Sequence, residues 1–235
     1  MSMTIAGSTR VAMLAYPGFT ALDLIGPHQI LASLPGMNVD VVAKTTEPVV
    51  SDRQISITPA KSFSECEADY DILFVPGGIS THLMLEDAET LAFLTRIGEK
   101  AAYITSVCTG SVILAAAGLL KGYRATSHWA YREILADYGA IPEKARFVED
   151  RNRVTGGGVT AGVDFGLHLA AILRGRDVAE MIQLVFEYDP KPPFDAGDPD
   201  RVAAEVLAAA VTRLEPLVAP VREAARRFAA RDQLK

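Results

Sequence analysis

Short apolar runs alternate with longer amphipathic segments along most of this 235-residue chain. Apolar runs that end at Pro-Gly or Gly-rich turns predict buried strands, and apolar residues repeating every three or four positions predict helices. We expect strands at 10–16, 38–43, 54–58 (or a hairpin there), 71–75, 102–107, 124–127 and 153–155, and helices at 21–34, 88–100, 110–120, 129–138, 161–173 and 178–186. This alternation predicts an α/β fold with a mainly parallel sheet covered on both faces, and ligand sites at the strand C-termini.

The last part of the chain has a different character. Residues 190–199 form a polar, Pro-rich connection, and residues 201–234 are rich in Ala, Arg, Glu and Leu, which predicts a helix interrupted at Pro216 and Pro220. We therefore expect a domain over 10–199 and a helical extension over 200–235 that packs on the core or on a partner subunit. Residues 1–9 are expected to be disordered.

Composition narrows the class of protein. Hydrophobic residues make up 49% and charged residues 22%, which is ordinary for a globular domain. The net charge of −6 has the wrong sign for binding nucleic acid. The longest apolar run, 112–120, is far shorter than the roughly 20 residues of a membrane span, and the N-terminus does not resemble a signal peptide. We expect a cytoplasmic protein that acts on a small molecule, with no nucleic-acid or membrane partner.

The strongest chemical signal surrounds Cys108, in the segment TSVCTGS at 105–111. An expected strand ends just before it and a helix of small residues begins just after it, which is the setting of a nucleophile elbow. A helix N-terminus can lower a thiol pKa from ~8.5 to roughly 3.5–7.5, so we expect a thiolate rather than an inert buried thiol. Cys66 lies between two glutamates and is expected to be structural. No CxxC pair or metal-ligand spacing occurs.

Three further features gather at the same sheet edge. Gly77 and Gly78 follow the strand at 71–75, and with the Thr109 amide they could present N–H donors to a developing anion. Asp23 opens the first helix among apolar neighbours, so it is either an N-cap or a buried acid kept protonated. His128 either lines the pocket or caps a helix.

Together these motifs resemble the ThiJ/PfpI superfamily, and within it the isonitrile hydratase group. The matching segments are LDLIGPH at 22–28, ILASLP at 30–35, PGG at 76–78, TSVCTGS at 105–111, AAAGLL at 115–120, RATSHWAY at 124–131, TGGGVTAGVDF at 155–165 and PPFDAG at 192–197. The resemblance implies a flavodoxin-like three-layer sandwich, a homodimer, and hydration of an isocyanide to an N-substituted formamide without cofactor or metal.

By the same resemblance, Cys108 attacks the isocyanide carbon, Asp23 protonates the adduct to a thioimidate, and Thr109 holds the local hydrogen bonds. Gly78 lies at the donor side of the pocket, and Ile79 and Val159 lie near the nucleophile. Thr109 stands where the peptidase-like branch has a histidine, which argues against proteolysis.

Two other functions remain open at the level of sequence. A glyoxalase-like reaction on 2-oxoaldehydes would suit the same cysteine. A non-enzymatic redox or stress sensor could use oxidation of Cys108. Regulators that carry a similar domain append a helix-turn-helix pair, for which the roughly thirty residues after Pro199 are too few.

Overall fold

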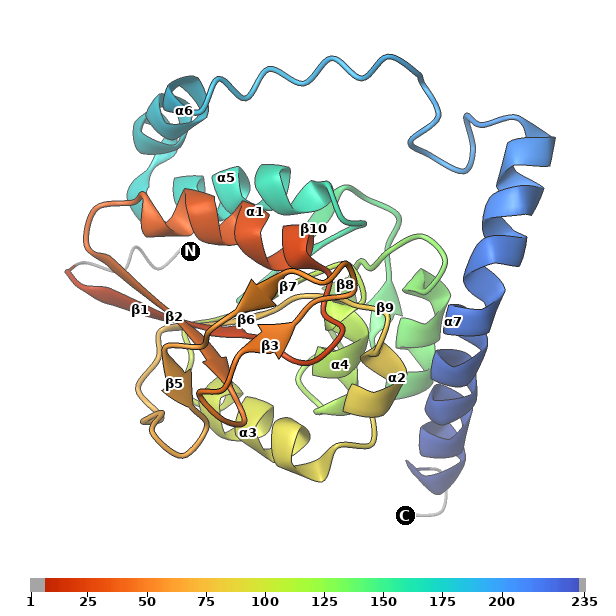
Figure 1. Cartoon of the computed structure of the whole chain (residues 1–235), viewed down its shortest axis with the longest axis horizontal. Helices are drawn as coiled ribbons and strands as arrows, with labels where there is room; N and C mark the ends of the chain where they lie inside the picture. Colours follow the sequence, from red (N-terminus) through yellow and green to blue (C-terminus); the bar gives the residue numbers. More distant parts are fainter. Residues whose placement is uncertain (1–6, 233–235) are drawn as a thin grey trace.

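The computed structural model describes residues 7–232 as a central sheet with helices on both faces (Figure 1). Within this range, seven strands form the sheet in the order β10–β11–β7–β6–β1–β2–β5. Their bounds are β1 (Thr9–Leu14), β2 (Met37–Ala43), β5 (Lys61–Ser62), β6 (Ile72–Val75), β7 (Tyr103–Val107), β10 (Phe147–Asp150) and β11 (Arg153–Gly156). Neighbouring strands are parallel except β10 and β11. The predicted α/β sandwich with a mainly parallel sheet is confirmed.

The centre of the sheet is apolar on both faces because helices cover both. Every residue of β6 and β7 is buried, and β1 is buried except for the partly exposed Arg10. The chain passes from β1 to β2 on one side and then crosses back to β6 on the other side of β1. This reversal opens a crevice at the C-terminal ends of β1 and β6, where α/β sheets bind ligands.

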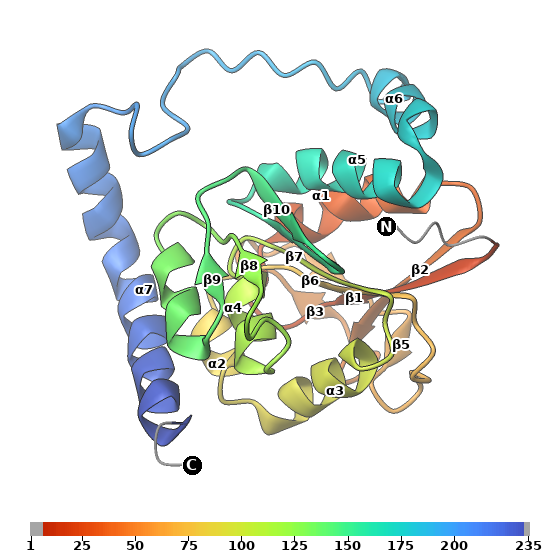
Figure 2. The ribbon, with the colours of Figure 1, turned by 180° about the vertical axis from the view of Figure 1, so that it is seen from behind.

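The helices form two outer layers. One face carries α1 (Ala21–Ala32) and α5 (Ala161–Arg174), with α6 (Arg176–Val185) against α5, and the other carries α2 (Thr81–Met84), α3 (Ala88–Gly98) and α4 (Gly110–Ala116) (Figures 1 and 2). Two small two-stranded sheets lie outside the central sheet. The antiparallel pair β3 (Val49–Val50) and β4 (Ser56–Ile57) forms the hairpin expected near 54–58. The parallel pair is β8 (Arg124–Ala125) and β9 (Ile141–Pro142).

Three local expectations need correction. The segment 129–138 forms a 3₁₀ helix, η1 (Arg132–Tyr138), instead of an α-helix. The antiparallel edge strand β10 was not predicted, because its residues FVED carry too short an apolar pattern. Thr9, expected to be disordered, begins β1 by pairing with Met37, while residues 1–6 lie outside the described part of the chain.

The C-terminal helix α7 (Ala204–Asp232) runs through both prolines without a break, so the predicted interruption is wrong. A proline removes one N–H and frees the carbonyl four residues earlier. Thr212 and Pro216 carry these freed carbonyls and are both exposed, so water can satisfy them. The helix lies against η1 and α2 at one end of the sheet (Figure 2). Its inward face buries Val218, Val221 and Ala225.

The connection between α6 and α7 crosses the molecule as an extended segment (Figure 1). Lys144 anchors it through ion pairs with Asp198, at 3.0 Å, and with Asp200. None of the helices in the described part of the chain combines the length and apolarity that crossing a bilayer requires.

Candidate active site

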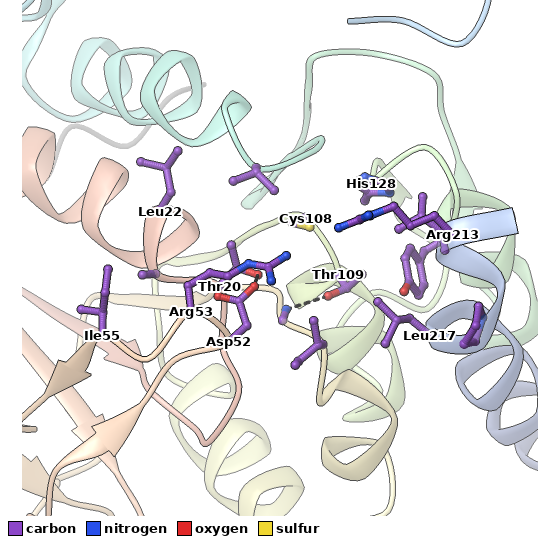
Figure 3. A pocket seen from close by; sticks show the side chains of 17 residues that line it. Thr20, Leu22, Asp52, Arg53, Ile55, Cys108, Thr109, His128, Arg213 and Leu217 are labelled. Atoms are coloured by element: carbon purple, nitrogen blue, oxygen red, sulfur yellow. Dashed lines mark hydrogen bonds between the residues drawn. The ribbon is translucent and has the colours of Figure 1, made fainter. Parts of the chain in front are cut away.

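A cleft of about 730 Å³ opens above the C-terminal ends of β6 and β7 (Figure 3). Six of the seven site residues expected from the sequence line it: Gly78, Ile79, Cys108, Thr109, His128 and Val159. The seventh, Asp23, is fully buried beneath the cleft wall. Loops and helices from distant parts of the chain therefore meet around one sulfur atom.

Cys108 occupies the predicted elbow between β7 and α4. Its φ of 57° lies in the left-handed region, which is unusual for a residue with a side chain. Its N–H donates to the carbonyls of Gly157, at 2.7 Å, and Gly156, at 3.2 Å, which fixes the strained turn. A Cβ on Gly110 would lie 2.0 Å from the Val75 carbonyl oxygen, so only glycine allows strand and helix to approach this closely.

The protonation of Cys108 differs from the sequence expectation. Burial raises the pKa of the thiol well above its ordinary value, and the Asp23 carboxyl adds to the rise. The backbone N–H of Thr109 opposes it, but α4 has only seven residues and cannot outweigh desolvation. The direction of this shift is opposite to the one expected from the sequence, and it favours the thiol beside the Asp23 carboxyl.

Asp23 is the buried acid, and the alternative reading as an N-cap is excluded. Thr20 holds the N-cap position of α1, and Asp23 Oδ2 accepts from the Gly77 N–H at 3.0 Å, across the sheet edge. Burial raises the Asp23 pKa to about 7, although hydrogen bonding to Cys108 and Gly77 offsets part of that rise. In the described chain its other oxygen, Oδ1, is buried without a hydrogen-bond partner.

Two of the three N–H groups expected to form an anion hole, those of Gly77 and Gly78, are engaged within the protein. The Gly77 N–H is engaged by Asp23, and the Gly78 N–H donates to Thr109 Oγ1 at 3.1 Å. The hydroxyls of Thr109 and Thr81 lie 2.6 Å apart, and Thr81 Oγ1 donates to the Gly78 carbonyl at 2.7 Å. This network orients the acid and holds the loop after β6 against the elbow. It stabilises no free anion.

His128 lies at the edge of the cleft as a neutral imidazole. Burial lowers its pKa to about 4, and its Nδ1 accepts from the Ala130 N–H at 3.3 Å. The Nε2 atom therefore carries the proton. Burial also raises the pKa of Tyr131 to about 12, so this lining residue, which sequence reasoning missed, stays a neutral phenol.

The remaining lining residues, apart from Leu22 in the LDLIGPH motif and Tyr131 in RATSHWAY, come from segments without a recognisable motif. They are Thr20, Ala21 and Leu22 at the start of α1, Asp52, Arg53 and Ile55 between β3 and β4, and Arg213, Leu214, Pro216 and Leu217 of α7. The helix periodicity of α7 was visible in the sequence, but its docking position was not. Among the described residues, no group of three or more His, Cys, Asp or Glu side chains is arranged to hold a metal ion.

The second cysteine has a structural environment. Cys66 is 5% exposed, and the Tyr70 hydroxyl approaches its sulfur at 3.8 Å. Burial raises the pKa of the Cys66 thiol. A protonated, packed thiol away from the cleft fits the expected structural role.

The raised pKa of Asp23 predicts a pH dependence of stability. The folded state keeps this carboxyl protonated up to about pH 7, whereas the unfolded chain ionises near pH 4. The stabilising contribution is complete below about pH 4 and is lost as the pH rises through 7. Between about pH 5 and pH 8, we expect the free energy of unfolding of wild type to fall by roughly 2–3 kcal/mol relative to that of Asp23→Asn. Urea unfolding of both proteins at each pH measures this, and a constant difference would contradict it.

Gly77 is predicted to tolerate no side chain. A Cβ there would lie 2.6 Å from both the N and Oγ1 of Thr109 and 2.8 Å from Asp23 Oδ2. We expect Gly77→Ala to destabilise the protein by about 2 kcal/mol, lowering Tm by roughly 4–8 °C. Gly197→Ala is the matched control because its Cβ would meet open space. Calorimetry of the two variants decides the question, and equal Tm values would remove the packing argument.

Several known proteins are similar to this chain. Residues 9–172 match the model of the DJ-1/PfpI family. The chain is 45% identical over 226 residues to isonitrile hydratase from Pseudomonas putida, covering 96% of this chain and 99% of that protein. A crystal structure of a ThiJ/PfpI family protein from Pseudomonas syringae superposes with a TM-score of 0.90 at 50% identity, covering 95% of this chain and 91% of that one. The HTH-type transcriptional regulator GbdR of Pseudomonas aeruginosa is 34% identical, but the match spans only 37% of its length.

Proposed function

Since this chain belongs to the DJ-1/PfpI family, as its motifs indicated, we propose that it is a hydratase that converts isocyanides to N-substituted formamides. The observation that carries the proposal is the pairing of the Cys108 thiol with the buried Asp23 carboxyl at the floor of the cleft. Its similarity to an isonitrile hydratase over nearly the full length of both chains supports the same conclusion.

The first half of the proposed reaction adds the thiol across the terminal carbon of R–N≡C. With Asp23 ionised, its unpartnered Oδ1 takes the proton from the Cys108 thiol, and the sulfur electron pair forms the S–C bond. One π pair of the triple bond moves to nitrogen, and the carbon keeps its own lone pair, which makes it an imidoyl anion. Asp23 returns its proton to that carbon, which gives the thioimidate R–N=CH–S–Cys108. No anionic oxygen forms in these steps, consistent with both glycine N–H groups being engaged.

The second half hydrolyses the thioimidate. Asp23, again ionised, takes a proton from water as the water oxygen bonds to the carbon, and it passes this proton to the imine nitrogen. The tetrahedral adduct R–NH–CH(OH)–S–Cys108 then collapses as the C–S bond breaks and Asp23 takes the hydroxyl proton. The formamide R–NH–CHO leaves, and Asp23 gives that proton to the Cys108 thiolate. Thr109 supports the cycle by holding the Gly78 loop and by directing its N–H toward the sulfur.

The raised pKa of Cys108 argues against the sensor alternative. Cysteines that sense peroxide react as accessible thiolates, whereas this thiol is 6% exposed and disfavours ionisation. A paired acid is instead suited to a substrate that must gain a proton at the carbon that the sulfur attacks.

We also propose that the protein works as a cytoplasmic homodimer. Helix α6 exposes Leu184 by 80% and Val185 by 66%, an apolar face on which a second copy could pack. Both cysteines are free in the described structure, which suits a reducing compartment. Sedimentation equilibrium of the purified protein tests the dimer.

The reaction is tested with cyclohexyl isocyanide as the substrate. Formation of N-cyclohexylformamide, followed by mass spectrometry, and a protein mass increased by one isocyanide at early times would support the proposal. Consumption of methylglyoxal without any isocyanide turnover would replace it with the glyoxalase alternative.

A further inference from the structure

The cleft is lined by two arginines in a protein that is acidic as a whole. Arg53 comes from the turn between β3 and β4, and Arg213 comes from α7. Figure 3 shows both guanidinium groups directed from opposite sides toward the middle of the cavity. The whole chain carries a net charge of −6, so this local concentration of positive charge runs against the average.

Both arginines are available to a ligand. Within residues 7–232 neither forms an ion pair, whereas Arg124, Arg151 and Arg222 each pair with a carboxylate on the surface. The other charged lining residue is Asp52, whose Oδ2 accepts from Thr20 Oγ1 at 3.1 Å. His128 is neutral. Two cations and one anion leave the cleft wall with a net charge of +1.

Apolar side chains form part of the same cavity wall. Leu22, Ile79, Val159 and Leu217 line the same cavity, and they offer contact to a hydrocarbon body without binding charge. Cys108 and both guanidinium groups face the same cavity, so a molecule that reacts at Cys108 would share that cavity with the two arginines. Guanidinium binds carboxylate through paired hydrogen bonds, and a local positive potential attracts anionic substrates.

We propose that the substrate is an isocyanide bearing a carboxylate at the end opposite the isocyano group, and that Arg53 and Arg213 recognise this carboxylate. The inference rests on the proposed function for the chemistry at Cys108. Arg53 lies within the family match at 9–172 and Arg213 lies beyond it, so the shared core and the C-terminal helix each supply one arginine.

A matched substrate pair tests the proposal: 4-isocyanobenzoate and its neutral methyl ester. We expect wild type to favour the acid in kcat/KM by roughly tenfold or more. The double variant Arg53→Gln/Arg213→Gln should bring the acid-to-ester ratio close to one. Arg226→Gln, an equal change of charge on the exposed side of α7, should leave the ratio unchanged. A wild-type ratio near one, or an equal fall in the Arg226 control, would overturn the inference.

A binding measurement separates this inference from the proposed function. Calorimetry with Cys108→Ala protein compares 4-formamidobenzoate with its methyl ester, and it needs no turnover. Tighter binding of the acid that depends on Arg53 and Arg213 supports the carboxylate subsite, and equal binding overturns it. Absence of turnover with both isocyanides would refute the proposed hydratase function and would leave the carboxylate subsite to be judged by the binding measurement.

Discussion

Replacing Cys108 by alanine is expected to abolish isocyanide hydration, with a fall in kcat of at least about 10⁴-fold. The reason is that Cys108 supplies the only covalent bond between protein and substrate in the proposed cycle, and removing a covalent nucleophile commonly costs up to about 10⁶-fold. Reactions quenched at fixed times, with formamide quantified by mass spectrometry, can measure a loss of this size.

The control for this variant is Cys66→Ala. Cys66 is buried near Tyr70 and outside the cleft, so its loss should alter packing without altering the reaction. Cys108→Ala should also fail to gain the mass of one isocyanide under conditions where the Cys66 variant gains it. Residual hydration by Cys108→Ala within tenfold of wild type would mean that water attacks the substrate directly.

The second large effect is expected for Asp23→Asn. The amide keeps the size of the side chain and can still accept from the Gly77 N–H, but it can neither take the thiol proton nor return it to carbon. General acid–base catalysis contributes roughly 10²–10⁴-fold, and we expect kcat to fall within that range. Turnover at the wild-type rate would reduce Asp23 to a structural role.

The pH profile distinguishes a lost proton carrier from a distorted site. In wild type the coupled pair loses its first proton near pH 7, because Asp23 has a pKa of about 7 and the thiol a higher one. The reactive form holds one proton, so kcat/KM should rise with pH through about 7 in wild type. This rise in kcat/KM should be missing in Asp23→Asn. A pH profile of unchanged shape in the variant would show that the rise comes from the titration of another group.

Local chemistry made several parts of the site predictable. The elbow at Cys108 followed from a buried strand that meets small residues, because only such residues allow a strand and a helix to approach closely. The buried acid at Asp23 followed from apolar neighbours in a helix that opens after a central strand. Both inferences depend on residues within about one turn of the side chain concerned, which a sequence displays directly.

The errors arose where distant segments decide the outcome. The thiol pKa depends on how deeply Cys108 is covered, and the covering residues come from other elements of the fold. The Gly77 and Gly78 N–H groups looked free because their partners, Asp23 and Thr109, lie 54 and 31 residues away in the chain. The part of the cleft lined by α7 could not be predicted for the same reason, because helical periodicity does not indicate where a helix packs on the fold.

The docking of α7 has a consequence for how substrate range could change in evolution. The reacting pair belongs to the segment that matches the family, whereas one side of the cleft entrance belongs to a separate helix that follows an extended connection. Substitutions on the inner side of that helix can therefore select a new class of molecule without disturbing the proton transfers beneath it. Part of the selectivity can therefore change independently of the reacting pair.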